Sequence, residues 1–328
     1  SSTNVVLGDT GDITYSAVDV LKLITTQEQT DSTLGGDTIS LKDGSAVVVG
    51  GLGKDVITAS AASSTTDNIR YITGDHAELT YDESGGLTDL VTLDTVDETG
   101  DDDTITLGTE GATNNIGLNM VVGGMWDDTI KIWDTTSSED IIIGDNAEIH
   151  RTEATSATSN RNWMLQATTI VNDKGGDDSI ITGSGGKVII GGFGEDDISA
   201  IDGDHLVIGD NGTLDYDTDA ENGILREMQS TDTVIGGADT IYLGEGYKIV
   251  IGGIGIDAIT VDGDAVAEAN GVLDVTGILS VLDLPDTDAG NTEAKGRTGR
   301  YVAGDNVLIE FDVDGGLTDI TSTDAIQA

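Results

Sequence analysis

Short loops built from glycine and aspartate recur along this 328-residue chain at spacings that suit the binding of metal ions. Three of them share the pattern G-G-x-G-x-D-x-U-x, where U is a large apolar residue: GGLGKDVIT at 50–58, GGFGEDDIS at 191–199 and GGIGIDAIT at 252–260. In such a nonapeptide the glycine turn lets backbone carbonyls reach a Ca²⁺ ion, the aspartate supplies a carboxylate, and the apolar residue points into a narrow core. A degenerate copy, GGMWDDTIK at 123–131, has Trp126 in place of the third glycine. The nonapeptides therefore indicate four aspartates and six glycine positions as metal ligands: Asp55, Asp128, Asp196, Asp257, Gly51, Gly53, Gly192, Gly194, Gly253 and Gly255.

Two further acidic turns accompany each nonapeptide. Upstream lies a shorter turn with the same D-x-U ending, which adds the candidate ligands Asp37, Asp103, Asp178 and Asp239. Downstream lies a G-D-N turn or a relative of it, which adds Asp75, Asp145, Asn146, Asp210, Asn211, Asp305 and Asn306. Because Asp and Gly are also ordinary turn residues, the alternative interpretation is that these side chains only close turns.

The spacing of these turns predicts the elements that carry them. The upstream and nonapeptide aspartates are 18 residues apart in three copies (55 − 37, 196 − 178 and 257 − 239) and 25 apart in the copy with an insertion (128 − 103). Apolar residues fall at half the shorter period, as in Ile180, Ile189 and Ile198. Eighteen residues suit one flattened coil of two short strands, and parallel strands of successive coils stack about 4.8 Å apart. We therefore predict an all-β fold, a parallel β-roll or β-helix solenoid with Ca²⁺-binding Gly/Asp turns.

The turns group into a larger unit that recurs along the whole chain. Each unit holds about six short strands, which we interpret as three coils, because the run after each G-D-N turn alternates apolar and polar residues as a strand does. The unit recurs about four and a half times, so residues 1–328 are predicted to be a single solenoid. Loop insertions are expected near 59–67, 109–118, 151–166 and 262–299.

Composition narrows the possible functions. The chain has 61 Asp and Glu against 14 Lys and Arg, for a formal charge of −47. Nucleic acid and anionic membranes both require a cationic surface, so neither is an expected partner, and metal cations are. No apolar run is long enough to cross a bilayer, so membrane insertion is not expected. The hydrophobic share of 37% argues against a disordered polymer, and the absence of cysteine excludes disulfides and thiolate metal sites.

The acidic turns are expected to fall on one side of the solenoid. Carboxylates about 5 Å apart repel by roughly 0.8 kcal/mol per pair in water and by roughly 3 kcal/mol at an effective dielectric of 20. Divalent cations between coils would reverse the sign of this term. An all-oxygen ligand set with irregular backbone carbonyls favours Ca²⁺ over Zn²⁺ and Mg²⁺. We expect several Ca²⁺ ions, mainly along one side.

The three complete nonapeptides resemble those of the repeats-in-toxin (RTX) family of secreted Ca²⁺-binding proteins. The resemblance implies a parallel β-roll whose turn aspartates and loop carbonyls bind Ca²⁺, and export by type I secretion from a Gram-negative bacterium to the outside of the cell or the cell surface. The long G-D-N super-repeats are closest in style to those of large bacterial surface adhesins and RTX-type surface-layer proteins. The chain departs from the family because its nonapeptides do not run in tandem.

The remaining motifs give weaker indications of function. The sequence DESGG at 82–86 echoes a serine nucleophile loop but fits a turn between strands, and His76, His150 and His205 are expected at surface or strand positions without catalytic duty. Trp126, Trp133 and Trp163 are expected to pack under insertions, the alternative being a patch that stacks on sugars. Lys295, Arg297 and Arg300 form the one basic cluster that could suit an enzyme acting on anionic polysaccharide.

The sequence thus predicts a Ca²⁺-stabilised extracellular structural protein rather than an enzyme. It would be a segment or a self-assembling subunit of a bacterial surface adhesin, surface layer or filament, with Ca²⁺-assisted self-association end to end or laterally. Cell-surface polysaccharide is a further candidate partner. The alternatives are an RTX module of a secreted polysaccharide-acting enzyme, or an ice-binding solenoid, although the Thr-x-Thr pattern of Thr104 and Thr106 is not kept from coil to coil.

Overall fold

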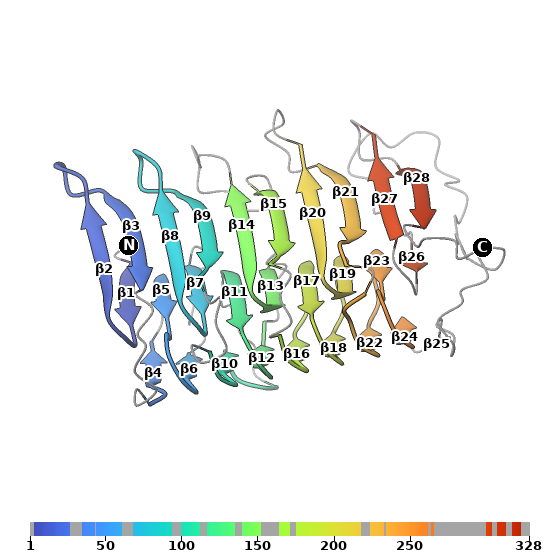
Figure 1. The fold of residues 1–328 in the computed structure, drawn as a ribbon, viewed down its shortest axis with the longest axis horizontal. Coiled ribbons are helices and arrows are strands. Elements are labelled where there is room, and N and C mark those ends of the chain that lie inside the picture. Colours follow the sequence, from blue (N-terminus) through green and yellow to red (C-terminus); the bar gives the residue numbers. More distant parts are fainter. Residues whose placement is uncertain are drawn as a thin grey trace.

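A computed structural model places the chain in three β-sheets that run side by side along one axis (Figure 1). It describes residues 3–26, 35–42, 44–60, 68–93, 100–111, 117–134, 140–151, 164–170, 175–217, 224–232, 234–261, 264–265, 300–303, 307–312 and 317–322. Within these ranges every regular element is a strand and no helix occurs. The all-β prediction is confirmed to that extent.

Sheet A is a nine-stranded parallel sheet in the middle tier of Figure 1. Its register keeps equivalent residues of successive coils side by side, as where Lys187 pairs with His205 and Ile190 with Ile208. In sheet order its strands are β1 (Asn4–Leu7), β5 (Ala46–Val49), β7 (Ile69–Thr73), β11 (Leu118–Gly124), β13 (Asp140–Asp145), β17 (Lys187–Gly192), β19 (His205–Asp210), β23 (Lys248–Ile251) and β26 (Arg300–Ala303).

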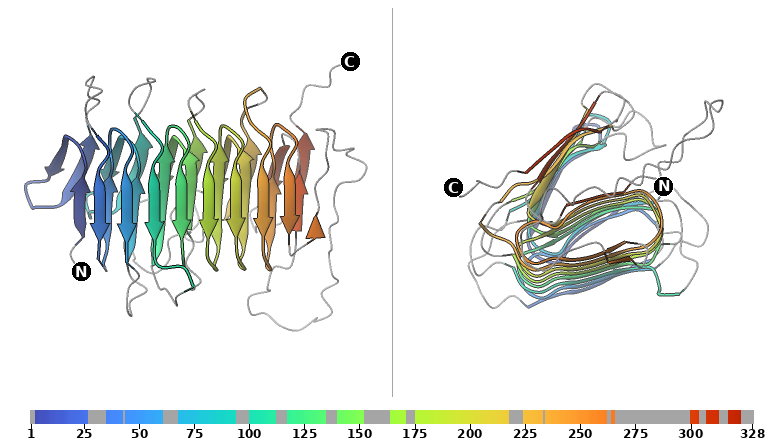
Figure 2. Two further views of the ribbon diagram at one scale, coloured as in Figure 1. Left: turned by 90° about the horizontal axis from the view of Figure 1, so that it is seen from below. Right: turned by 90° about the vertical axis from the view of Figure 1, so that its right-hand side faces the viewer.

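Sheet C forms the lower tier and is parallel except at one end, where its last strand pairs antiparallel with its neighbour. In sheet order its strands are β4 (Thr38–Leu41), β6 (Val56–Ala59), β10 (Thr104–Leu107), β12 (Thr129–Ile132), β16 (Ser179–Thr182), β18 (Asp197–Ala200), β22 (Thr240–Leu243), β24 (Ala258–Val261) and β25 (Asp264–Ala265). The end-on view in Figure 2 shows sheets A and C as the two sides of a flattened coil. Long parallel sheets of this kind are those of a β-solenoid.

Sheet B forms the upper tier and consists of five hairpins joined edge to edge into one antiparallel sheet. All five hairpins show a register shift next to the last residue of their first strand, as at Tyr81, Arg151 and Tyr216. The hairpins are β2–β3 (Gly11–Tyr15, Leu21–Thr26), β8–β9 (Ala77–Tyr81, Leu87–Thr92), β14–β15 (Ala147–Arg151, Met164–Thr169), β20–β21 (Gly212–Tyr216, Leu225–Ser230) and β27–β28 (Val307–Phe311, Leu317–Ser322).

The repeating unit is therefore two coils and one hairpin, and the predicted third coil is wrong. The chain visits sheets C, A, C and A through β16, β17, β18 and β19, and then forms the hairpin β20–β21 before returning to sheet C at β22. The first strands of two other hairpins, β8 and β14, alternate buried and half-buried residues, because one face packs on the core and the other faces solvent. Strands with that pattern are typical of an antiparallel sheet that has one solvent-exposed face.

Sheet A is the middle layer of three and is buried on both faces. Ile180, Ile189 and Ile198, predicted at half the coil period, are all fully buried in one core cluster between sheets A and C. The alternate residues of sheet A, such as Val188 and Ile190, belong to a second cluster that includes Leu214 and Met228 of sheet B. Burial on both faces explains why the strands of sheet A are continuous apolar runs such as AVVV.

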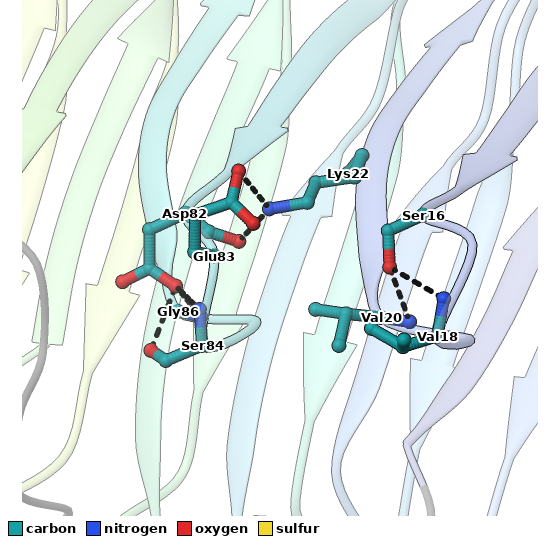
Figure 3. Close-up of polar contacts among 8 residues, drawn as sticks. All are labelled: Ser16, Val18, Val20, Lys22, Asp82, Glu83, Ser84 and Gly86. Carbon is teal, nitrogen blue, oxygen red and sulfur yellow. Dashed lines mark hydrogen bonds and ion pairs between the residues drawn. The ribbon is translucent and has the colours of Figure 1, made fainter.

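Neighbouring hairpins also touch at their tips, as Figure 3 shows for the first two. Lys22 of β3 donates through Nζ to the carbonyl oxygen of Asp82 at 2.6 Å and lies 3.2 Å from Oε1 of Glu83. Asp82 in turn accepts hydrogen bonds through Oδ1 from the backbone N–H groups of Ser84 and Gly86. The DESGG segment is thus a hairpin turn closed by its own aspartate.

Most residues of the predicted insertions lie outside the described ranges, including 61–67, 112–116, 152–163 and 266–299. Where the flanking residues are described, the insertion near 151–166 connects the two strands of one hairpin, β14 and β15. Lys295, Arg297, Trp163, Asp305 and Asn306 also lie outside the described residues, and for Arg300 only the backbone is described.

Candidate metal-binding corner

One corner of the coil, where sheet A strands lead into sheet C strands, collects most of the predicted ligands. Each turn here begins with a glycine at the end of a sheet A strand or just after it, and ends with the aspartate that precedes a sheet C strand. We call this edge the acidic corner, and its turns are 8–37, 50–55, 74–103, 123–128, 144–178, 191–196, 209–239 and 252–257. Its closing residues, one per coil, are Asp37, Asp55, Asp103, Asp128, Asp178, Asp196, Asp239 and Asp257.

Two kinds of turn alternate along the acidic corner. The nonapeptides make the short turns, and the first four hairpins of sheet B are each inserted inside one of the long turns. The G-D-N and upstream G-G-D motifs, which the sequence presents as separate turns, are therefore the two ends of one split turn. In the split turn 144–178, for example, Gly144 leaves β13 and Asp178 enters β16, with the hairpin β14–β15 between them.

The eight closing aspartates form an unbroken hydrogen-bonded column. From Asp55 onward, Oδ1 of each carboxylate accepts the backbone N–H of the closing aspartate one coil before it, as where Asp178 donates to Asp196 at 2.8 Å and Asp196 donates to Asp239 at 2.9 Å. The five other links, from Asp37 to Asp55, Asp55 to Asp103, Asp103 to Asp128, Asp128 to Asp178 and Asp239 to Asp257, follow the same pattern. The predicted one-sided stack of aspartates is thus present.

The second carboxylate oxygen of these residues has a different environment. Among the closing aspartates, Oδ2 is buried and has no hydrogen-bond partner in Asp55, Asp103, Asp128, Asp178, Asp196 and Asp239. Each of these six aspartates is at most 2% exposed. A buried carboxylate oxygen without a donor carries a large desolvation cost unless it gains a proton or a cation.

Each Oδ2 faces the glycine that opens its own turn. A Cβ built on Gly191 would overlap Oδ2 of Asp196 and the carbonyl oxygen of Gly209 in the next coil, and the same holds for Gly123 against Asp128 and Gly144. Carboxylate and carbonyl oxygens therefore lie together beside each opening glycine. The opening glycine is required because any side chain would fill this oxygen-lined space.

The G-D-N aspartates have a different role from the closing aspartates. Asp210 accepts the N–H of Gly237 through Oδ1 at 2.9 Å and the N–H of Ile254 through Oδ2. Asp145 likewise accepts from Gly176, at 3.2 Å, and from Phe193. Each of these two carboxylates ties the far end of its split turn to the next nonapeptide.

The other G-D-N residues follow the same plan. Oδ2 of Asp9 accepts the backbone N–H of Leu52, and Oδ2 of Asp75 accepts that of Met125, both at 2.6 Å. Each donor is the third residue of a nonapeptide. The backbone carbonyls of Asn146 and Asn211 accept the N–H groups of Ile170 and Thr231, which closes the base of each hairpin. These hydrogen bonds are the ones expected if the G-D-N residues close turns. Metal ligation by Asp75, Asp145, Asn146, Asp210 and Asn211 stays a prediction.

The nonapeptide glycines adopt the conformations that the motif requires. Gly192 and Gly194 have φ of 128° and 119°, values that L side chains rarely adopt, and the corresponding glycines Gly51, Gly53, Gly253 and Gly255 are also at positive φ. Trp126 keeps the left-handed conformation of the glycine it replaces, with φ of 73°. The degenerate nonapeptide therefore makes the same turn under backbone strain.

Burial and mutual repulsion disfavour the charged form of these carboxyls. Burial, together with a smaller contribution from neighbouring carboxylates, raises the pKa of Asp55 to about 7, of Asp239 to about 8 and of Asp103 to about 9. Burial likewise raises the pKa values of Asp128, Asp178 and Asp196 well above 3.8. The G-D-N carboxyls follow, with the pKa of Asp210 raised to about 9 by burial and then by Asp239.

The arrangement restricts how a metal could be held. Among the described residues, no three His, Asp or Glu side chains converge on one point that could hold an ion. A Ca²⁺ ion at this corner would therefore combine one or two carboxylate oxygens with backbone carbonyls, a ligand set that Ca²⁺ accepts.

The opposite corner, where sheet C strands lead into sheet A strands, contains a buried polar column that the sequence analysis missed. Its side chains lie inside the coil on the first or second residue of sheet A strands: Arg70, Asn119, Asp140, Lys187, His205 and Lys248. Nζ of Lys187 lies 3.0 Å from Oδ2 of Asp140, with both side chains fully buried. The sequence signal was the lysine that ends the turns GSGGK and GEGYK.

The histidines are partly misplaced by the sequence interpretation. His205 is fully buried but lies in strand β19, as the expectation of surface or strand positions allows, whereas His76 is fully buried and lies outside the strands. His150 is half-buried on the outer face of sheet B, where Nδ1 lies 2.7 Å from Oδ1 of Asp89.

The outer face of sheet C does not carry a regular threonine array. Thr104 lies beside Thr129, but Ser179 lies beside Asp197, and Ser199 lies beside Tyr242. This face does not favour the ice-binding alternative. Trp126, which is 38% exposed, lies in a nonapeptide turn of the acidic corner.

Comparisons with known proteins add no relative. No protein-family model matches the chain, and searches of curated proteins and of solved structures find no significant match. A helix long and apolar enough to cross a membrane is not found among the described residues.

Proposed function

We propose that this chain is a Ca²⁺-stabilised structural solenoid that acts outside the cell. The observation that carries the proposal is the row of six buried Oδ2 atoms without a hydrogen-bond partner at the acidic corner. Carboxylates repeated in every coil, with one oxygen held by a backbone N–H and the other left without a donor, are suited to share cations along the stack.

A cation at this corner would offset two unfavourable terms together. It would offset the desolvation of the buried oxygens and the repulsion between carboxylates of adjacent coils. The donor chemistry fits Ca²⁺, because the acidic corner offers only carboxylate and carbonyl oxygens and varies in turn length between short and split turns. The residues that would hold the ions are Asp55, Asp103, Asp128, Asp178, Asp196 and Asp239, with the carbonyls of the opening glycines.

The rest of the molecule supports a structural role. The chain repeats one unit along an axis, and a formal charge of −47 keeps its outer surface strongly hydrated. The RTX-like nonapeptides support secretion by a type I system and a place in a surface adhesin, surface layer or filament of a Gram-negative bacterium. For this role we propose two interactions. One is Ca²⁺-assisted association with further copies of the chain, and the other is contact with cell-surface polysaccharide.

The test compares the loss of two buried carboxylates with the loss of two exposed ones that flank one of them in the chain. In the double variant Asp178→Asn/Asp196→Asn both residues belong to the closing column, whereas the control Glu195→Gln/Asp197→Asn removes the same charge from exposed neighbours. Unfolding by denaturant is followed by circular dichroism in excess chelator and across a Ca²⁺ titration. Ca²⁺ should stabilise the wild type and the control to the same degree and the double variant less. Wild-type stability that is identical in chelator and in saturating Ca²⁺ would defeat the proposal.

A further inference from the structure

The corner opposite the acidic corner is closed by amino groups of the chain itself. We call it the lysine corner, and its short turns are 183–186, 201–204 and 244–247, which precede Lys187, His205 and Lys248. Lys187 and Lys248 are 1% and 0% exposed, and each is the first residue of its sheet A strand. Their side chains share the strand face of Ile189 and Val250, so they point into the coil rather than out to solvent.

Each of the two ammonium groups donates to a carbonyl of its own turn, and that of Lys187 is also paired with the carboxylate of Asp140. Nζ of Lys187 donates to the carbonyl oxygen of Ser184 at 2.9 Å, and Nζ of Lys248 donates to that of Glu245 at 2.9 Å, each three residues back along the chain. Lys248 also donates to the carbonyl oxygen of Gly203, which belongs to the turn one coil before. One ammonium thus joins the turns of two coils, as a bound cation would.

The residue between the two lysines in the sheet keeps them apart. His205 pairs in register with Lys187 on one side and Lys248 on the other. Burial, followed by the charge of Lys248, lowers the pKa of His205 to about 3, so the ring is neutral at pH 7, and Nε2–H donates to the carbonyl oxygen of Ile201. A neutral spacer prevents two buried ammonium groups from lying in adjacent coils.

We propose that the turns of the lysine corner are cation sites that the chain fills with its own ammonium groups, at Lys187 and at Lys248. The ligand class of such a site is a primary ammonium ion, whose three N–H donors match converging carbonyl oxygens. The lysine corner then closes without any added ion. If the proposed function is correct, on which this last step rests, the dependence of the fold on metal is confined to the acidic corner.

The cation-site assignment is tested by chemical rescue. Lys248→Ala removes the ammonium and most of its stem, so that the carbonyl of Gly203 loses the Nζ donor and that of Glu245 keeps the N–H of Gly203 as its donor. Denaturant midpoints of this variant are compared in n-propylammonium chloride and in sodium chloride of equal ionic strength. Propylammonium should raise the midpoint of Lys248→Ala in a saturable way and leave the wild type unchanged.

Two control variants separate binding from general salt effects. Lys248→Met keeps the stem and blocks the space, so propylammonium should not rescue it, and Lys131→Ala alters a partly exposed lysine on the outer face of sheet C. If Lys248→Ala does not fold in sodium chloride, the rescue is read as the recovery of β-sheet circular dichroism on refolding in propylammonium. Equal midpoints in both salts, failure to fold in either, or equal rescue of Lys248→Met would overturn the assignment.

A measurement on the wild-type protein tests where the metal dependence lies. Reductive methylation with formaldehyde is followed by peptide mass spectrometry in chelator and in Ca²⁺. Lys187 and Lys248 should react slower than Lys131 by a factor of roughly ten or more in both conditions, because a buried lysine reacts only when the structure opens locally. If chelator exposes Lys187 and Lys248, the metal dependence extends to the lysine corner and this inference fails while the proposed function stands. If Ca²⁺ changes neither stability nor methylation anywhere, the proposed function fails and the cation sites of the lysine corner stand.

Discussion

The backbone N–H of Asp128 donates a hydrogen bond to Oδ1 of Asp178 at 2.7 Å, although 50 residues separate the two aspartates. The same link joins Asp178 to Asp196 across only 18 residues. Both intervals contain one strand of sheet C and one of sheet A, and the longer one contains the entire hairpin β14–β15 in addition, yet the two aspartates occupy neighbouring positions in the column. Insertion of a hairpin inside a corner turn therefore leaves the axial register of the solenoid unchanged.

The pH dependence of the metal-free protein should run opposite to that of an ordinary acidic protein. The folded-state pKa values of Asp55, Asp239 and Asp103 are raised from 3.8 to about 7, 8 and 9, mainly by burial. The folded state then binds more protons than the unfolded state, so the stability from these groups is fully present below pH 3.8 and is lost as pH rises through about 7 to 9.

His205 contributes with the opposite sign. Its pKa is lowered from 6.5 to about 3, so its share of stability is lost as pH falls through that interval. The raised carboxyls outnumber this one histidine, so stability in chelator should be higher near pH 5 than near pH 8. Denaturant titrations at several pH values measure it, with saturating Ca²⁺ as the control in which the slope should flatten or reverse. A metal-free stability that increases from pH 5 to pH 8 would contradict the burial of ionisable closing aspartates.

The closing aspartates and the G-D-N aspartates should respond differently to replacement by asparagine. Both oxygens of Asp145 accept backbone N–H groups, from Gly176 and Phe193, so the amide of Asp145→Asn must turn an N–H₂ group toward a donor. The cost of such a buried mismatch is about 1–3 kcal/mol. In Asp196→Asn the amide instead falls where Oδ2 has no donor and the carbonyl oxygen of Gly209 is close.

In chelator at neutral pH, therefore, Asp145→Asn should lower the free energy of unfolding and Asp196→Asn should raise it or leave it unchanged. Denaturant unfolding of the two variants beside the wild type is the measurement. Equal destabilisation by the two substitutions would mean that the closing and G-D-N aspartates have the same structural role.

How much of this arrangement the sequence could predict depends on the period of each feature. The 18-residue interval between closing aspartates correctly predicts adjacent coils, and Ile180, Ile189 and Ile198 are all buried in one stack. The hairpins were not predicted, because their second strands carry no motif and the connections within split turns vary in length. A usable signal was present in paired alternating runs such as AELTY and LTDLVT, separated by a short glycine loop.

The buried lysines mark the limit of prediction from sequence. A lysine at the start of a strand ordinarily faces solvent, so Lys187 and Lys248 read as solubilising residues of the less acidic side. Only the structure shows that these ammonium groups donate hydrogen bonds to the turn carbonyls of Ser184 and Glu245.

Substitution of an opening glycine should be far more costly than substitution of an exposed one. A Cβ at Gly191 would overlap the carbonyl oxygen of Gly209 and Oδ2 of Asp196, both held by the coil stack, whereas a Cβ at Gly35 would meet no atom within 4 Å. Gly191→Ala should cost about 1–3 kcal/mol or more, in chelator and in Ca²⁺ alike. Gly35→Ala, the matched control, should change stability by less than about 0.5 kcal/mol. Thermal unfolding of the two variants compares them, and a Gly191→Ala protein as stable as Gly35→Ala would mean that the corner has room the structure does not show.

The ion pair between Lys187 and Asp140 should be strongly coupled. Both side chains are fully buried, and Oδ1 of Asp140 also accepts the backbone N–H and the Nδ2–H of Asn119, each at 2.9 Å. Lys187→Met removes the cation and leaves this carboxylate without its counter-charge, which costs about 3–5 kcal/mol in buried pairs.

The double variant Lys187→Met/Asp140→Asn removes both charges and keeps an acceptor for Asn119, so it should be more stable than Lys187→Met alone. The coupling free energy from the four unfolding measurements of this cycle should therefore be large and favourable. A coupling near zero would show that the two groups do not depend on each other in the folded state. The cycle is measured in chelator, because the lysine corner is expected to hold its charge balance without any added ion.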